Sequence, residues 1–83
     1  MTEAVLSVGI DEVVIAPANE RRLALVVQNF EGQVVVLYGD RSRALSAGDA
    51  LEIGDGRVQW LGAVSARRVQ GRGDVGIVEE SKP

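Results

Sequence analysis

The chain has no cysteine and no histidine among its 83 residues, and Lys82 is its only lysine. Disulfides and the common structural zinc sites are built from cysteine and histidine, so neither can reinforce this fold. The usual general base and most activated nucleophiles of enzymes are missing for the same reason. We therefore predict a protein that is not an enzyme and that holds no metal or cofactor.

Carboxylates are the catalytic or metal-binding groups that this composition still supplies. The candidates lie in or beside turn signals: Asp40, Asp49, Glu52 and Asp55. Aspartate is favoured at turns because its side chain hydrogen-bonds its own backbone. A calcium loop would need aspartates at alternating positions, and that spacing does not occur. Turn formation explains these residues without a hydrolase-like carboxylate pair.

Acidic residues outnumber basic ones, which gives a formal net charge of −3 and a pI of about 4.8. Nucleic-acid binding is disfavoured, since phosphate contacts require clustered lysine and arginine. No run of 18 apolar residues occurs, so no transmembrane helix is expected. The start Met1-Thr2-Glu3-Ala4 lacks the basic and apolar stretches of a signal peptide, and we expect synthesis in the cytoplasm.

Valine dominates what the chain does contain, with 14 residues beside 4 isoleucines, and both types suit strands. No window keeps the spacing of an amphipathic helix. Strands are expected at 5–8, 11–16, 23–29, 34–38, 50–53, 58–60, 63–69 and 75–79, separated by glycine-containing turns. About eight short antiparallel strands predict one all-β domain over residues 1–83, either a two-sheet β-sandwich or a jelly-roll-like barrel.

The segments between and outside these strands carry their own expectations. Residues 30–33 include a glycine and predict a hairpin between the strands on either side. Residues 41–46 favour a short helix or an irregular loop. Residues 1–9 are expected to form an N-terminal arm that adds to a neighbour's sheet, or an ordinary edge strand. Residues 80–83 are expected to be a loose tail.

Two expected strands, 23–27 and 34–38, are apolar at every position, so both of their faces favour burial. One face can enter the core. The other is covered either by a neighbouring loop or by another chain. A domain of this size buries a limited share of its surface, which favours a homo-oligomer.

Residues 63–69 break the alternation of a strand. Val64 and Ala66 share one face, whereas Val69 falls on the other. A β-bulge at the pair Arg67-Arg68 would return Val69 to the core side; otherwise the strand ends near Ala66. Trp60, the only tryptophan, is expected to be either a core plug with its N–H bonded to a carbonyl or an anchor at a protein interface.

Three segments follow one another in a specific order. Pro17-Ala18-Asn19, in which the asparagine can close a turn with its side chain, leads into the apolar run 23–27. Ala47-Gly48-Asp49-Ala50-Leu51 and Trp60-Leu61-Gly62-Ala63-Val64 come later. Over about residues 14–79 this order resembles a group of small β-sandwich virion proteins of tailed bacteriophages, which decorate the head or sit in the tail. Arg22 falls where that family carries an arginine, and Glu20 stands where the family often has proline.

The resemblance implies a capsid decoration protein that binds the outside of the head shell and ties neighbouring capsomers together. Its partner would be the major capsid protein or another virion protein, its location the virion, and its assembly a cyclic homotrimer. The alternative is a tail-tip or fibre module that contacts the host surface. Candidate contact residues are apolar residues of the N-terminal segment and arginines near turns and strand ends: Val5, Leu6, Val8, Arg41, Arg43, Arg67, Arg68 and Arg72.

Overall fold

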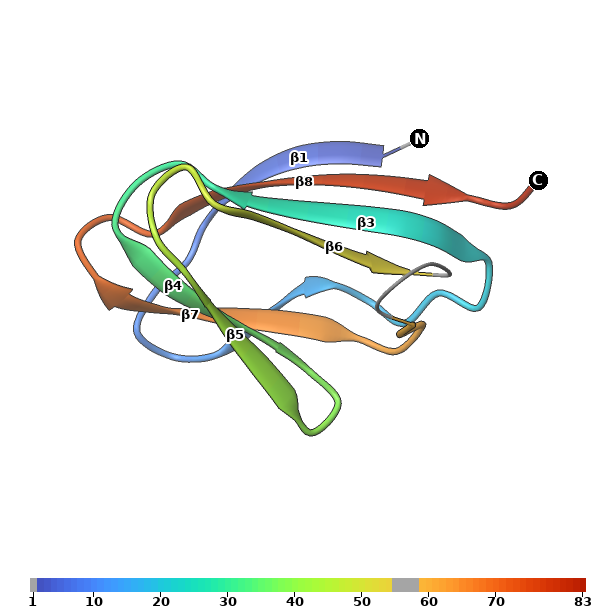
Figure 1. Cartoon of the computed structure of the whole chain (residues 1–83), viewed down its shortest axis with the longest axis horizontal. Helices are drawn as coiled ribbons and strands as arrows, with labels where there is room; N and C mark the ends of the chain where they lie inside the picture. The colour runs from blue at the N-terminus through green and yellow to red at the C-terminus, as the bar shows by residue number, and fades with distance from the viewer. Residues whose placement is uncertain (1, 55–58) are drawn as a thin grey trace.

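The computed structural model describes residues 2–54 and 59–83, and these form two antiparallel sheets packed face to face (Figure 1). Sheet A has the order β1 (Thr2–Ser7), β8 (Asp74–Ser81), β3 (Arg22–Asn29) and β6 (Ala50–Gly54). Sheet B has the order β2 (Val13–Ala16), β7 (Val64–Gln70), β4 (Gln33–Tyr38) and β5 (Arg41–Leu45). The prediction of a small all-β sandwich is confirmed.

The core lies between the two sheets and is filled by alternate residues of the strands. Leu25 and Val27 of β3 face Val34 and Val36 of β4 across this space, and all four side chains are fully buried. The remaining buried apolar residues are Val8, Ile15, Ala16, Tyr38, Leu45, Leu51, Ile53, Val64, Ala66, Val75 and Ile77. Strand alternation thus places one face of each sheet in a common core.

The prediction of a hairpin at residues 30–33 is wrong, because this segment crosses from sheet A to sheet B. Strand β3 pairs with β8 and β6, whereas β4 pairs with β7 and β5. Gly32, with φ of 73°, passes so close to the connection between β7 and β8 that a side chain there would collide with the carbonyl oxygen of Arg72. Each of the two apolar strands therefore occupies an inner position in a different sheet.

Residues 41–45 form strand β5, so the expected helix or irregular loop is also wrong. Tyr38 pairs with Arg41 across the two-residue turn Gly39-Asp40. Gly39 has φ of 67°, and glycine is preferred at the first position of such hairpin turns. Because β5 is an edge strand with four exposed residues, its sequence lacks the apolar alternation that marks a strand.

The ends of the chain belong to sheet A. Strand β1 pairs with β8 over its whole length and forms one edge of the sheet. Strand β8 continues to Ser81, so Glu80 and Ser81 pair with β3 and are not part of a loose tail. Of the strand expected at 58–60, residue 58 lies outside the described residues, Gln59 makes one isolated bridge to Gly54, and Trp60 lies outside the named strands.

Strand β7 has a bulge beside the pair Arg67-Arg68, which was one of the two alternatives predicted from the sequence. Arg67 pairs with Val35 and Arg68 with Val34, after which the register shifts. The strand continues to Gln70 and does not end near Ala66. Val69 nevertheless stays 50% exposed, so the bulge does not return it to the core.

Asn29, the last residue of β3, hydrogen-bonds both segments that cross between the sheets at this end, the one from β3 to β4 and the one from β5 to β6. Its Nδ2 donates to the carbonyl oxygens of Gly32 at 2.9 Å and Leu45 at 3.0 Å. Its backbone N–H donates to Asp49 at 2.9 Å, and its own carbonyl accepts from the N–H of Gly48 at 2.8 Å. One buried side chain thus holds the segment after β3 and the segment after β5.

We expect Asn29→Ala to lower the free energy of unfolding by about 1–3 kcal/mol, since the buried carbonyl of Leu45 and the part-buried carbonyl of Gly32 lose their donor. Loss of the buried Oδ1, which has no hydrogen-bond partner among the described residues, offsets part of this cost. Gln28→Ala, at the exposed preceding position, is the control and should change stability by less than about 0.5 kcal/mol. Urea unfolding with an unchanged m-value measures both, and equal effects would contradict the assigned role.

Candidate functional site

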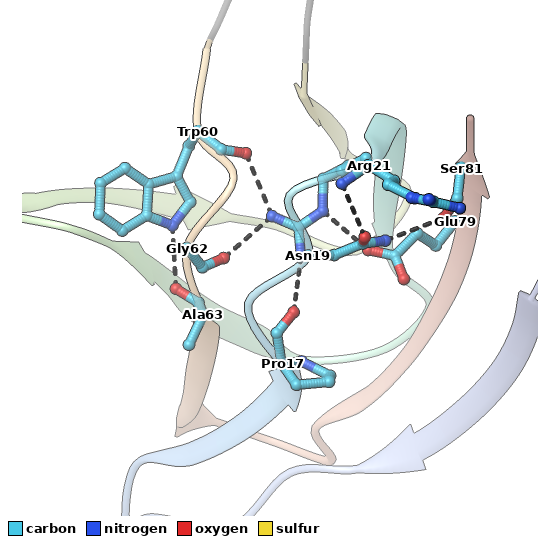
Figure 2. Close-up of polar contacts among 9 residues, drawn as sticks. Pro17, Asn19, Arg21, Trp60, Gly62, Ala63, Glu79 and Ser81 are labelled. Atoms are coloured by element: carbon cyan, nitrogen blue, oxygen red, sulfur yellow. Dashed lines mark hydrogen bonds and ion pairs between the residues drawn. The ribbon is translucent and has the colours of Figure 1, made fainter. Parts of the chain in front are cut away.

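Arg22, the first residue of β3, is buried at one end of the sandwich and bonds four acceptors. Its Nε donates to Oε2 of Glu79 at 2.7 Å, which also makes an ion pair. Its Nη1 donates to the carbonyl oxygens of Trp60 at 3.1 Å and Gly62 at 2.9 Å, and Nη2 donates to that of Pro17 at 2.9 Å. Figure 2 shows these acceptors converging from separate segments of the chain.

The guanidinium acts here as a structural cross-link. Its planar fork offers five N–H donors in fixed directions, which suits one carboxylate and several carbonyls at once. The Arg22 side chain has no exposed surface, so its charge is not available to a binding partner. Sequence reasoning noted Arg22 only through the family resemblance, because no local pattern reveals acceptors that are 38 to 57 residues away.

Asn19 closes the turn that brings Arg22 into place, as expected. Its Oδ1 accepts from the N–H of Arg21 at 3.0 Å, and its Nδ2 donates to Oγ of Ser81 at 2.8 Å. Its backbone N–H donates to the carbonyl of Leu61 at 2.7 Å, while its own carbonyl accepts from Arg22. The turn before β3 is thereby hydrogen-bonded to Ser81 at the end of β8 and to Leu61 in the segment that leads to β7.

Trp60 is a half-buried plug at the end of the core. Its Nε1 donates to the carbonyl oxygen of Ala63 at 2.9 Å (Figure 2). The indole ring fills the space beside two glycines: a Cβ on Gly62 would come within 2.5 Å of it, and one on Gly39 within 3.0 Å. The ring packs against the core and bonds a carbonyl, which agrees with the expected core plug, although it lies at the rim.

We expect Arg22→Ala to lower the free energy of unfolding by about 3–5 kcal/mol, because Glu79 and the carbonyls lose their buried partner. Arg22→Lys keeps the charge but not the fork, and should recover only part of that loss. The neighbouring Arg21→Ala, at an exposed position, is the control. Urea unfolding followed by Trp60 fluorescence measures all three, and wild-type stability of Arg22→Lys would show that the fork is not required.

The outer face of sheet A, called face A, is apolar at its centre. Val5 is 72% exposed and Val78 37% exposed, and they flank a shallow groove with half-buried Val26. Phe30, 46% exposed, folds onto the same face over Gly76, where a Cβ would come within 2.8 Å of the ring. Among the described residues none completely covers the outer side of β3, so the apolar surface predicted there is partly exposed.

Carboxylates surround this apolar centre. Alternation along the strands points four of them outward from sheet A: Glu3, Glu52, Asp74 and Glu80. The single basic residue in the strands of sheet A is Arg22, and it is buried. Face A is therefore apolar with an acidic margin.

The outer face of sheet B, called face B, is apolar with a basic residue. Val35 and Leu37 of β4 are half-buried, and Val14 of β2 is exposed on the same face but is separated from them by β7. Arg67 pairs with Val35 and stands exposed on the same face. The outer side of β4, like that of β3, is therefore incompletely covered.

The candidate contact residues of the N-terminal segment are divided between the surface and the core. Val5 lies on face A. Leu6 is half-buried against the core, and Val8 belongs to the core itself. Only Val5 of these three presents most of its side chain to a partner.

The candidate arginines are also separated. Arg41 and Arg43 are exposed on the same side of β5 and stay together. Arg67 and Arg68 alternate across sheet B, so they point to opposite sides. Arg72 lies in the connection before β8 and pairs with Glu31 at 3.6 Å and Asp74 at 3.4 Å. Arg67, Arg68 and Arg72 therefore do not form one cluster, because Arg67 points away from the side of the sheet that carries Arg68.

No protein-family model matches the chain, and no curated protein matches it in sequence. Within residues 2–54 and 59–83, no three metal-binding side chains are grouped to hold an ion. The same residues include no helix that is long and apolar enough to cross a membrane. Among the described residues, the exposed apolar faces A and B and the exposed arginines of the β5 edge are the surfaces suited to contact a partner.

Proposed function

We propose that this chain is a non-enzymatic structural protein of a tailed-phage virion, a decoration protein that binds the outside of the head shell. The observation that carries this proposal is face A, where Val5, Phe30 and Val78 present apolar surface on a sheet. Exposed apolar surface with a polar margin is typical of protein–protein contacts. The resemblance of the sequence to small phage virion proteins supports the choice of partner.

The proposed mechanism is mechanical. Any contact that is made with the assembled shell but not with its dissociated subunits stabilises the shell by mass action. Many copies, acting together as a homo-oligomer, add weak contacts through multivalency, so no single tight site is needed. Arg41 and Arg43 on the β5 edge are suited to pair with carboxylates of the major capsid protein, since arginine binds carboxylates through two parallel hydrogen bonds.

The location of the protein on the particle tests this proposal. Immunogold labelling of purified virions of the phage that encodes the chain should place it on the head surface, in many copies per particle. Label on the tail would instead support a tail-tip or fibre module that contacts the host. Absence of the chain from purified particles would overturn the proposal.

We expect the double variant Arg41→Gln/Arg43→Gln to bind shells more weakly and with a flatter salt dependence. Each exposed arginine should contribute no more than about 1 kcal/mol, so occupancy should fall gradually and not vanish. Co-sedimentation with undecorated shells at several salt concentrations measures this effect. Arg21→Gln, an exposed arginine outside β5, is the control and should bind as the wild type does. Equal occupancy of all three proteins at every salt concentration would exclude the β5 arginines from the contact.

A further inference from the structure

The two sheets of the sandwich carry opposite charge. The strands of sheet A contain five carboxylates and one arginine, and that arginine is buried: Glu3, Glu52, Asp74, Glu79, Glu80 and Arg22. The strands of sheet B contain four arginines and no carboxylate: Arg41, Arg43, Arg67 and Arg68. Three of these arginines, Arg41, Arg43 and Arg68, are paired with core-facing residues of β4, so Arg67 is the one that points outward from the strands of sheet B. The outer side of sheet A carries four carboxylates, one of which, Asp74, is paired with Arg72. Within the described strands, the outer side of sheet A is therefore acidic and that of sheet B carries one positive charge.

Each charged side also has an uncovered apolar centre. On face A it consists of Val5, Val78 and the ring of Phe30. On face B it consists of Val35 and Leu37, with Arg67 beside Val35. An acidic margin on one apolar surface and a basic side chain on the other make the two faces complementary in both charge and polarity.

We propose that face A of one copy binds face B of a second copy of this chain. Two copies meeting through face A would bring two sets of outward carboxylates together, and two meeting through face B would bring their Arg67 side chains together. Like charges placed face to face weaken association, so the mixed pairing is favoured over both. This inference concerns the isolated protein and does not rest on the proposed function. A copy whose face A is covered by a neighbour still presents Arg41 and Arg43 of the β5 edge to a shell, and the copy at one end of the series keeps its face A exposed.

Pairing of two different faces leaves one face of each kind free at the ends of every assembly. Because the two faces lie on opposite sides of the sandwich, such a contact extends into an open series. Self-pairing of one face would stop at a dimer. The two kinds of assembly are therefore distinguishable by the mass of the species formed and by the behaviour of single-face variants.

Variants that block one face each provide the test. Val78→Glu places a carboxylate at the centre of face A, and Leu37→Glu places one at the centre of face B. Both positions point toward solvent, where a glutamate can keep its charge hydrated. Ile10→Glu, in the exposed connection between β1 and β2, is a matched control outside both faces.

Sedimentation equilibrium from about 1 μM to about 1 mM should show the average mass of the wild type and of Ile10→Glu rising with concentration. Each face variant alone should remain a monomer. Their equimolar mixture should form a one-to-one pair and nothing larger, because each partner supplies the single intact face that the other lacks. Circular dichroism checks the fold, and if Leu37→Glu does not fold, Val14→Glu at an exposed position blocks the same face.

Three results would overturn the proposal. The first is a wild type that stays monomeric over the whole range. The second is a face variant that self-associates as the wild type does, which would reveal pairing of like faces. The third is a mixture that remains monomeric although the wild type associates.

Discussion

The buried ion pair of Arg22 with Glu79 is the contact on which one end of this sandwich depends. It joins the first residue of β3 to β8 within sheet A, while the same guanidinium binds carbonyls of Trp60 and Gly62 in the segment that leads to β7 in sheet B. A buried charge is tolerated only when it is paired and its donors are satisfied. The corner at Asn19 and the position of Trp60 follow from that requirement.

The fold class could be predicted because it depends on local information. Val, Leu and Ile at alternate positions specify strands wherever one face is buried, and glycine-rich segments separate them. Strand β5 could not be found in this way, since Arg41 to Ala44 are exposed on both sides of an edge strand. The connection from Asn29 to Gln33 was misread because a short glycine-containing segment fits a hairpin as well as a crossing, and its close approach to Arg72 is visible only in three dimensions.

The candidate faces were harder to predict, since they are products of the strand order. Face A joins β1, β8 and β3, so Val5, Val78 and Val26 come from three distant parts of the chain. Phe30 follows β3 directly, yet its position over Gly76 depends on β8 being the neighbour of β3. The separation of acidic and basic strands has the same origin, because the charged residues of each sheet are interleaved along the sequence. The composition gives the net charge of the chain. Which sheet carries the acidic residues and which the basic ones depends on the strand order.

Strand β3 explains how so small a domain can leave two faces open. Its first residue, Arg22, and its last, Asn29, are both fully buried, and each binds backbone carbonyls of segments that run between the sheets. The two ends of the sandwich are therefore held by polar contacts, while the apolar residues between them form the core. With both ends fixed in this way, neither sheet needs a covering loop to keep its place. The outer apolar residues are then presented on a preorganised surface, and ordering that surface costs little when a partner binds.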